Sequence, residues 1–321
     1  MKLSKKKSLI KNVVFISGLI RSGKALLCPI ISSFNNTEKV NIAGGNFTLE
    51  QIPMLNYMGE MSDDVARFLL QTGMNTSFYD NSIGRNSNFR PNDFTSVWKY
   101  RNPMEYVMRL FEPDGDAVLT KLISQNRTYP MMVHNGLWHA HIWFNALPNL
   151  KLIHMQRSPI EIVYSWMGKG YGNDFYYSDR VGLVTFEHDK KTLPYHAYGW
   201  EDKYLSLKNV DRIIHMVNHI RNLHYDSYER LESDIKNRVL FIRHQNFTEN
   251  PNKYLTKISN FIGEEPSNDT LNILMQENCP RIFDEKVFEK KTKEIKMQSS
   301  NDAFTLLMEM QTQFKSEKLA I

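Results

Sequence analysis

The pattern of apolar and polar positions alternates between two kinds of segment along most of the chain. Short runs of β-branched and aromatic residues predict buried strands, and the longer segments between them have the spacing of helices. The predicted strands cover residues 13–16, 40–43, 130–133, 151–156 and 239–242, and the predicted helices cover residues 24–34, 160–166, 203–232 and 251–261. Strands that alternate with helices predict one α/β domain over residues 1–321, with a mostly parallel sheet flanked by helices.

Two long stretches lie outside this alternation. Residues 44–100 are mixed in composition and predict loops, and we expect a substrate-facing insertion at about residues 44–125. Residues 168–200 are rich in Gly, Tyr and Asp and predict a long functional loop. The charged tail, residues 284–321, is predicted to be partly helical, and Pro29 predicts a bend or a late start in the first helix.

The composition narrows the class of protein. Of the 321 residues, 41% are hydrophobic and 23% are charged, which is typical of a globular chain. The two cysteines, Cys28 and Cys279, exclude a disulfide scaffold and a multi-cysteine zinc site, and they favour a reducing compartment. A net charge of +5 suits a small anionic ligand better than a nucleic acid, which usually requires a denser basic face.

The N-terminus imitates a signal peptide without completing one. Lysines at positions 2, 5, 6, 7 and 11 precede an apolar run at residues 13–20, but Ser17 and Gly18 interrupt that run and no small-residue cleavage site follows. No apolar stretch reaches the length of about 18 residues that a membrane span needs. We therefore expect a cytoplasmic protein without a membrane span, and the sequence leaves a homo-oligomer open.

The segment between the first predicted strand and the first predicted helix has the spacing of a Walker A phosphate loop. It reads Gly18-Leu19-Ile20-Arg21-Ser22-Gly23-Lys24-Ala25, and Leu26 follows in the helix. Glycines let the backbone of such a loop approach a ligand, N–H groups point inward, and the helix N-terminus favours negative charge. With the cations Arg21 and Lys24, the loop predicts a phosphate or sulfate site.

Ala25 distinguishes between two uses of this loop. In an enzyme that uses ATP or GTP, a Ser or Thr hydroxyl at this position ligates Mg²⁺. The alanine therefore weakens the interpretation as a small-molecule P-loop kinase, which stays an alternative. A transferase whose donor needs no metal does not require that hydroxyl.

A second anion site is predicted where the strand at residues 151–156 ends. Arg157-Ser158-Pro159 opens the next helix, and Ser165 follows eight residues after Arg157. A strand-end arginine and a hydroxyl on the following helix can bind one phosphate by charge and by hydrogen bonding.

Together the two motifs resemble those of sulfotransferases that use 3′-phosphoadenosine 5′-phosphosulfate (PAPS). In that family a Gly-x-x-Arg-Ser-Gly-Thr-Thr loop holds the 5′-phosphosulfate, and Arg-x-Pro with a serine eight residues after the arginine binds the 3′-phosphate. A third similarity is a strand followed by Glu249-Asn250-Pro251 and a helix that ends in Phe261-Ile262-Gly263. The resemblance covers residues 12–35 and 130–263. It implies a P-loop NTPase-like α/β fold and sulfuryl transfer from PAPS to a hydroxyl or amine of a small-molecule or carbohydrate acceptor.

The resemblance also implies which residues carry the function. The donor-binding candidates are Gly18, Arg21, Ser22, Gly23, Lys24, Ala25, Leu26, Arg157, Ser165 and His244. The catalytic candidates are Lys24 for the transferring group and His134 as the base, with Glu50 as its rival. His134 ends a predicted strand where the family has a functional lysine or a nearby histidine, and a histidine can accept a proton at neutral pH.

Three departures separate the chain from the family pattern. Lys24-Ala25 replaces Thr-Thr, His244-Gln245-Asn246 replaces a Tyr-Glu-Asp turn, and His134 stands where many members have lysine. These departures leave a catalytically inactive nucleotide-binding member open as an alternative.

Three other groups of residues have a structural and a functional interpretation. His134, His139 and His141 lie close in sequence, but no carboxylate or cysteine completes a metal site, so we expect no metal. Tryptophans 138, 143 and 166 can belong to the core or line an acceptor pocket. Lysines 290, 291 and 293 form a solvated charged face or add contacts to a 3′-phosphate.

Overall fold

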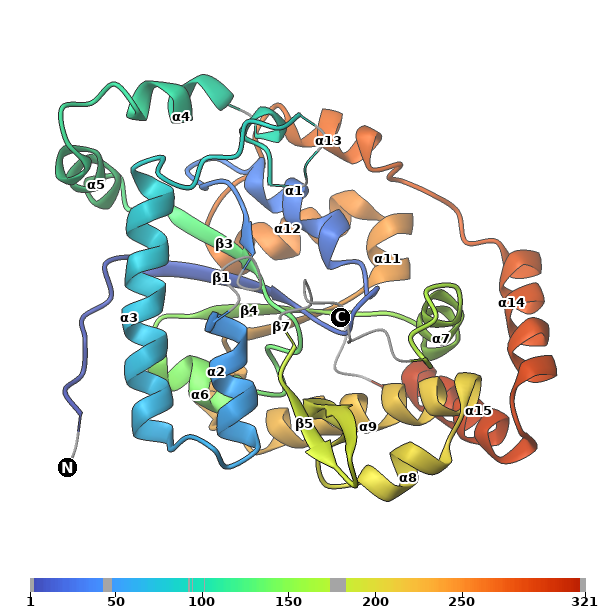
Figure 1. Cartoon of the computed structure of the whole chain (residues 1–321). Helices are drawn as coiled ribbons and strands as arrows, with labels where there is room; N and C mark the ends of the chain where they lie inside the picture. Colours follow the sequence, from blue (N-terminus) through green and yellow to red (C-terminus); the bar gives the residue numbers. More distant parts are fainter. Residues whose placement is uncertain are drawn as a thin grey trace.

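The computed structural model describes residues 3–42, 48–91, 93, 95–100, 102–173 and 183–317. The central strands are β1 (Asn12–Ser17), β2 (Asn41–Ile42), β3 (Thr128–Met132), β4 (Lys151–Gln156) and β7 (Val239–Arg243). They form a parallel sheet with the order β2-β3-β1-β4-β7 (Figure 1). This sheet confirms the predicted α/β class, and each predicted strand is present.

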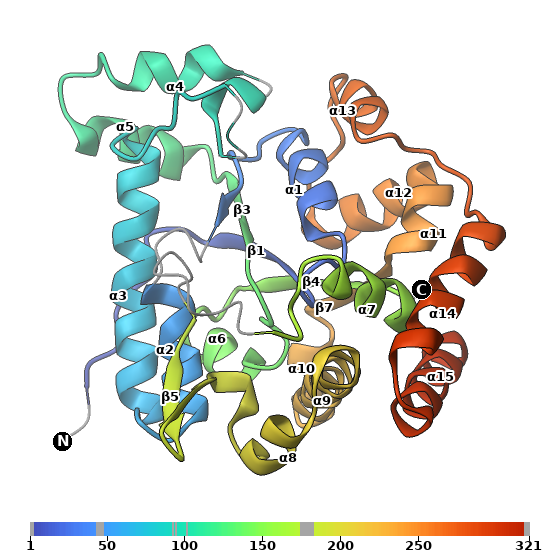
Figure 2. The same cartoon turned by 45° about the vertical axis from the view of Figure 1, so that its right-hand side comes forward.

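Helices cover both faces of the sheet and the ends of its strands (Figures 1 and 2). The helices are α1 (Lys24–Ser32), α2 (Thr48–Tyr57), α3 (Asp63–Ser82), α4 (Pro103–Arg109), α5 (Gly115–Ser124), α6 (Ala140–Ala146), α7 (Pro159–Met167), α8 (Glu201–Ser206), α9 (Asn209–Glu229), α10 (Ser233–Lys236), α11 (His244–Glu249), α12 (Pro251–Ile262), α13 (Thr270–Gln276), α14 (Glu285–Gln298) and α15 (Asn301–Ser316). Two 3₁₀ turns, Val97–Lys99 and Tyr195–Ala197, and a hairpin of β5 (Thr185–His188) and β6 (Lys191–Pro194) complete the described elements.

Alternate residues of the strands face different helices, so the sheet is buried on both sides. Val14 and Ile16 of β1 pack in a cluster with α1, α12 and Phe247, whereas Val13 and Phe15 pack with α3 and α6. Strands that are covered on both faces are hydrophobic without interruption, which is why the apolar run at residues 13–16 predicts a strand correctly. Phe15 also contacts the buried Trp143 edge to face, with ring centroids 4.9 Å apart.

Residues 48–82 differ from the prediction, because they form helices α2 and α3 rather than loops. The 20-residue helix α3 buries Ala66, Leu70, Met74 and Phe78 against the sheet. These residues recur at every fourth position, which is the spacing of one helix face. Polar residues occupy many of the positions between them, so the segment has no continuous apolar run and its helical pattern is easily missed.

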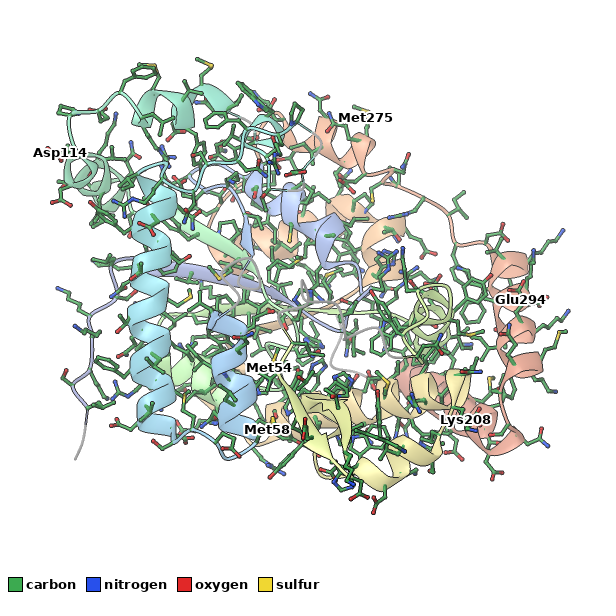
Figure 3. The ribbon with its side chains drawn as sticks, in the orientation of Figure 1. Met54, Met58, Asp114, Lys208, Met275 and Glu294 are labelled. Carbon is green, nitrogen blue, oxygen red and sulfur yellow. The ribbon has the colours of Figure 1, made fainter. Side chains whose placement is uncertain are left out.

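A third core lies where α7, α9 and α15 pack together beside the hairpin (Figure 2). Trp138 and Trp166 are buried in this core. Met54 of α2 and Met58, which follows that helix, belong to it as well and are labelled in Figure 3. All three tryptophans that were considered for an acceptor pocket are therefore core residues, with at most 3% of their surface exposed.

The helix predicted at residues 203–232 is divided into α8 and α9, and α9 ends at Glu229. Helix α1 begins at Lys24 and continues through Pro29, and α12 ends at Gly263, whose φ of +83° suits a glycine. The loop predicted at residues 168–200 contains the β5–β6 hairpin, while residues 174–182 lie outside the described residues. None of the described helices is long and apolar enough to cross a membrane.

Candidate active site

The carboxyl ends of the parallel strands gather the candidate residues at one edge of the sheet. Ser17 at the end of β1 lies opposite His154 of β4, and Gln156 at the end of β4 lies opposite Arg243 of β7. From β1 the chain passes to β2 on the far side of β3, whereas β4 lies on the other side of β1. In open α/β sheets, ligands bind beyond the strand ends next to such a change of direction.

The backbone of loop 18–23 has the tight geometry that the glycine spacing predicts. Gly18 has a φ of +143°, and a Cβ on it would lie 2.4 Å from the carbonyl oxygen of Met155. Gly23, the N-cap of α1, has a φ of +106°, and Arg21 is left-handed with a φ of +69°. Because side chains rarely tolerate these conformations, the glycines are what allows the loop to fold over the strand ends.

Lys24 lies across this loop rather than in solvent. Its Nζ donates to the carbonyl oxygens of Gly18 at 2.6 Å and Leu19 at 2.8 Å, and the side chain is buried. Burial lowers the pKa of Lys24 to about 8, and the negative charge of Glu50 opposes that fall. A cation held behind a loop in this way can turn toward an anion that arrives at the loop.

Two hydroxyls beside the loop lack partners. The Oγ atoms of Ser17 and Ser22 are buried and make no hydrogen bond with any of the described residues. Ala25 is exposed, and the Leu26 side chain packs in the core with α12. Since buried polar atoms are nearly always hydrogen-bonded, Ser17 and Ser22 mark a place where a polar ligand would be favoured.

The two predicted anion sites meet. The Nε atom of Arg21 donates to the Oγ of Ser165 at 3.0 Å, and Nη1 of Arg157 donates to the carbonyl oxygen of Arg21 at 3.1 Å. Residues that lie more than 130 positions apart in sequence therefore share one patch. This convergence places both candidate phosphate-binding motifs on one surface.

Glu161, which the sequence analysis overlooked, holds Arg157 in place. Its carboxylate accepts from Nε and Nη2 of Arg157 at 3.0 and 3.3 Å and from Nζ of Lys291 at 3.0 Å. Although burial opposes the change, these partners lower the pKa of Glu161 to about 2. The spacing of four residues from Arg157 is the sequence signal that could have revealed this pair.

Lys291 brings the C-terminal part of the chain to the same patch. Helix α14 packs on α7, where Glu294 (labelled in Figure 3) accepts a hydrogen bond from Tyr164 at 2.9 Å. Lys290 lies 3.9 Å from Glu294, and its side chain is 77% exposed. Of the lysine cluster, Lys291 thus lies against α7 beside Arg157, and Lys290 belongs to a solvated face.

The two rival candidates for the base contact each other. One carboxylate oxygen of Glu50 accepts the backbone N–H of His134, and the other lies 3.1 Å from His134 Nδ1. Glu50, in the first turn of α2, is buried, whereas the His134 side chain is 32% exposed. With the imidazole proton on Nδ1, Glu50 orients the ring and leaves Nε2 free to accept a proton.

His134 lies close to the loop because β3 ends beside β1. The N–H of Val133 donates to the carbonyl oxygen of Ile16 at 3.0 Å. A Cβ on Gly136 would lie 2.9 Å from Ser17 Oγ, so the turn after His134 packs against the start of the loop.

An aromatic stack supports the segment that follows His134. The indole of Trp138 stacks on Tyr195 and His139 with centroid distances of 5.1 and 4.8 Å, and Tyr57 meets it edge to face. Asn135 donates to the Tyr195 hydroxyl at 3.0 Å. Burial lowers the pKa of His139 to about 3, which keeps its ring neutral and suits it to this stack.

His244 packs on the loop from the other side. A Cβ on Gly23 would lie 2.4 Å from Cδ2 of His244, so the absence of a side chain at Gly23 lets the imidazole approach. Burial lowers the pKa of His244 to about 4, and the ring is neutral at pH 7. His244 therefore lies against the candidate donor loop, as a neutral group.

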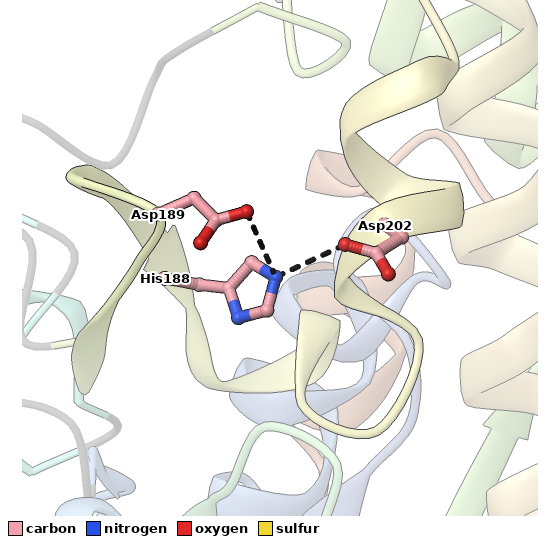
Figure 4. Close-up of side chains that lie close together, drawn as sticks. All are labelled: His188, Asp189 and Asp202. Atoms are coloured by element: carbon pink, nitrogen blue, oxygen red, sulfur yellow. Dashed lines mark hydrogen bonds and ion pairs between the residues drawn. The ribbon is translucent and has the colours of Figure 1, made fainter.

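A group of metal-ligand type occurs away from this edge. His188, Asp189 and Asp202 place one ligand atom each within 4.8 Å of one another, on the hairpin turn and at the start of α8 (Figure 4). The aspartate side chains are 83% and 91% exposed, and hydrogen bonding to Asp202 raises the pKa of His188. This geometry is that of a surface ion pair joining the hairpin to α8.

Comparisons with known proteins agree with this geometry. A family model described as the sulfotransferase domain matches residues 11–317, so the chain belongs to the sulfotransferase family. No curated protein matches the chain significantly.

Solved structures show the same fold at low sequence identity. The sulfotransferase domain from the curacin biosynthetic pathway is 12% identical, with a TM-score of 0.50 over 96% of this chain and 99% of that chain. The sulfotransferase domain from the Synechococcus PCC 7002 olefin synthase is 13% identical, with a TM-score of 0.47 over 99% of both chains. The similarity at a TM-score of 0.50 shows the fold of a sulfotransferase, and the low identity makes the chain a divergent member of the family.

Proposed function

We propose that this chain transfers a sulfuryl group from PAPS to a hydroxyl or amine of a small-molecule or carbohydrate acceptor, without a metal ion. The observation that carries the proposal is the meeting of loop 18–23 with Arg157 and Ser165 at the strand ends. A donor with a phosphosulfate at one end and a 3′-phosphate at the other requires two such anion sites.

The residues at this edge have separate roles in donor binding. Backbone N–H groups of loop 18–23 and the hydroxyl of Ser22 would hold the 5′-phosphosulfate, with charge from Arg21 and Lys24. Arg157 and Ser165 would hold the 3′-phosphate, and Lys291 adds charge next to Arg157. Glu161 keeps Arg157 extended before the donor arrives, which reduces the entropy lost on binding.

Catalysis then depends on positioning and on one proton acceptor. As the acceptor oxygen or nitrogen forms its bond to sulfur, the bond between sulfur and the bridging oxygen of the donor breaks. Lys24 and Arg21 stabilise the negative charge that develops on the leaving phosphate. His134 Nε2 takes the proton of the acceptor, and Glu50 stabilises the imidazolium ion that forms.

Ligand-dependent thermal unfolding tests the donor. We expect 3′-phosphoadenosine 5′-phosphate to stabilise the protein by about 2.7 kcal/mol at 100 times its Kd, with or without Mg²⁺. ATP with and without Mg²⁺ provides the comparison. Stabilisation by ATP only when Mg²⁺ is present, with none by the 3′-phosphorylated nucleotide, would support a kinase and contradict the proposal.

The variant His134→Ala tests the base. It should bind 3′-phosphoadenosine 5′-phosphate almost normally but transfer the sulfuryl group roughly 10²–10⁴-fold more slowly. His141→Ala, seven residues further along the chain, is the control. Normal turnover by His134→Ala would remove this residue from the mechanism and leave Glu50 as the base, and binding without turnover in the native protein would identify an inactive member.

The remaining expectations follow from the same proposal. Residues 44–125 and 168–200 are proposed to supply the acceptor contacts, since acceptor pockets are built from variable loops. A cytoplasmic location and a homo-oligomer stay predictions.

A further inference from the structure

A small cavity lies behind the donor site, between β4, α9 and the end of α15. Its wall includes Leu19 of the loop, Arg157, and the polar side chains of His154, Gln156 and His224. The cavity has a volume of about 20 Å³, which is enough for about one water molecule.

Three polar atoms on the wall of this cavity are unsatisfied. Nδ1 of His154, Nε2 of His224 and Oε1 of Gln156 make no hydrogen bond within the described ranges, and these residues are 5%, 2% and 6% exposed. The two imidazoles meet edge to face with centroids 4.8 Å apart. Buried polar groups without partners indicate a place that is built for a polar occupant.

A carboxylate from the C-terminal segment binds to three residues of the cavity wall. Glu317 Oε1 accepts from Arg221 Nη2 at 2.8 Å, and its Oε2 accepts from the Tyr225 hydroxyl at 2.6 Å and from Gln156 Nε2 at 3.4 Å. Arg243 Nη2 donates to the backbone carbonyl oxygens of Phe314 and Glu317, both at 2.7 Å. Three side chains therefore converge on one carboxylate, and a fourth holds the backbone that carries it.

We propose that Gln156, Arg221 and Tyr225 form an oxyanion-binding site that the chain fills with its own Glu317. Where the Glu317 carboxylate is absent, the site takes a small free oxyanion, such as sulfate. We call these three residues the oxyanion seat.

The charge balance of the oxyanion seat supports this inference. The Arg221 side chain is 8% exposed, and Glu317 is its only ion-pair partner among the described residues. A buried guanidinium without a counter-ion is strongly unfavourable, so loss of Glu317 creates a demand for another anion. Arginine and tyrosine donors suit sulfate or phosphate oxygens as well as a carboxylate.

The location of the oxyanion seat connects its occupant to the donor site. Gln156 belongs to the seat, and the next residue, Arg157, belongs to the proposed 3′-phosphate site. Leu19 of the loop lies on the wall of the same cavity. The oxyanion seat therefore lies next to both anion sites.

Thermal unfolding of Glu317→Ala in sodium chloride and in sodium sulfate at equal ionic strength tests the proposal. In chloride the variant should have a lower Tm than the native protein. Sulfate should then raise the Tm of the variant in a saturable manner, by about 2–4 °C more than it raises that of the native protein. Sulfate at loop 18–23 affects both proteins equally and cancels in this difference.

Two further variants make the test specific. Glu309→Ala removes an exposed carboxylate from the same helix, and its response to sulfate should equal that of the native protein. Adding Tyr225→Phe to Glu317→Ala should reduce the extra gain, because one donor of the seat is lost. An arm with sodium acetate shows whether a planar carboxylate fills the seat as well as sulfate does.

The outcomes decide the proposal. An equal sulfate gain in Glu317→Ala and the native protein would overturn it, and Glu317 would then be a structural clamp alone. If Glu317→Ala folds only when sulfate is present, the proposal is supported. If it folds in neither salt, Glu317→Gln, which keeps the shape of the side chain, is compared in the same way. The readout involves no PAPS and no acceptor, so it is independent of the proposed function.

Discussion

Two polar clusters of this protein are both buried, but they differ in how far their polar groups are paired. Around Glu38, each carboxylate oxygen has a charged or hydroxyl partner. Around loop 18–23, Ser17 and Ser22 have buried hydroxyls without partners among the described residues, and Lys24 donates to carbonyl oxygens of its own loop. The difference indicates which cluster maintains the fold and which awaits a ligand.

The Glu38 cluster fastens the 97–125 region to the sheet. Arg109 and Arg127 each approach Glu38 Oε1 at 2.8 Å, and the Tyr106 hydroxyl donates to Oε2. Although burial opposes it, the charge of Arg109 leads the partners that hold the pKa of Glu38 below its usual value. Glu105 is a second carboxylate partner, at 2.8 Å from Arg109 and 2.5 Å from Arg127, so two arginines are matched by two carboxylates.

Around loop 18–23 the charged and polar groups are not paired in this way. This region holds the cations Arg21 and Lys24, and two of its buried hydroxyls make no hydrogen bond with the described residues. A bound anion stabilises such a region. Without the anion, the region contributes less to the free energy of unfolding. Substitutions in the Glu38 cluster should therefore lower the free energy of unfolding, whereas substitutions around loop 18–23 should weaken ligand binding.

The largest expected effect comes from breaking the paired cluster. Glu38→Gln leaves Arg109 and Arg127 without their shared buried counter-ion and should lower the free energy of unfolding by about 3–5 kcal/mol at pH 7, measured with urea. The affinity for 3′-phosphoadenosine 5′-phosphate should change little. Glu60→Gln, at an exposed position, is the control and should match the native protein.

The same cluster predicts a pH dependence. A carboxyl group whose pKa is lower in the folded than in the unfolded state stabilises the protein above its unfolded value, here about 4.5, and loses that contribution as the pH falls through its folded value. The native protein should therefore lose stability more steeply than Glu38→Gln below about pH 4.5. Parallel curves from acid titrations of the two proteins would contradict the assignment.

Substitutions at the candidate anion sites should have a smaller effect. They should weaken nucleotide binding rather than the stability of the fold. Arg157→Ala should weaken binding of 3′-phosphoadenosine 5′-phosphate by about 1.5–3 kcal/mol in calorimetric titration. It should leave the affinity for adenosine 5′-phosphate nearly unchanged. Lys169→Ala, which removes an exposed cation just after α7, is the matched control. An equal loss of affinity for both nucleotides would show that the 3′-phosphate does not bind at Arg157.

The smallest effect is expected at the surface group of His188, Asp189 and Asp202. His188→Ala should change neither the unfolding midpoint nor nucleotide affinity, because exposed ion pairs contribute little and are screened by salt. Circular dichroism melting curves in low and high salt measure this. A clear loss of stability that disappears in high salt would show that the pair does hold the hairpin to α8.

The sequence predicted those parts of the fold whose signals are local. Val13 to Ile16, the glycines at 18 and 23, and Pro159 after Arg157 fix a strand, a loop and a helix start within a few positions, and the structure has all three. Helix α3 was not predicted because its buried face, with Leu70 and Met74, is diluted by polar neighbours.

The site was predictable only where one motif carries the chemistry. Nothing in the sequence places Glu50 against His134, 84 positions away, or Arg21 against Ser165, because the parallel sheet creates those contacts. The same holds for Glu317 and Arg221. The pairing of Arg157 with Glu161, by contrast, was available from a spacing of four residues on one helix.

Because of the position of Lys24, binding of an anion at the loop should be coupled to the uptake of protons. With a pKa of about 8 and its amine held by two loop carbonyls, Lys24 is only partly charged in mildly alkaline solution. An anion at the loop favours the ammonium form and raises that pKa, so the complex takes up part of a proton from the buffer. Donor affinity then falls as the pH rises above 8, and the heat of binding depends on the ionisation enthalpy of the buffer. If loop 18–23 binds the donor as proposed, the lysine at position 24 makes that binding responsive to pH.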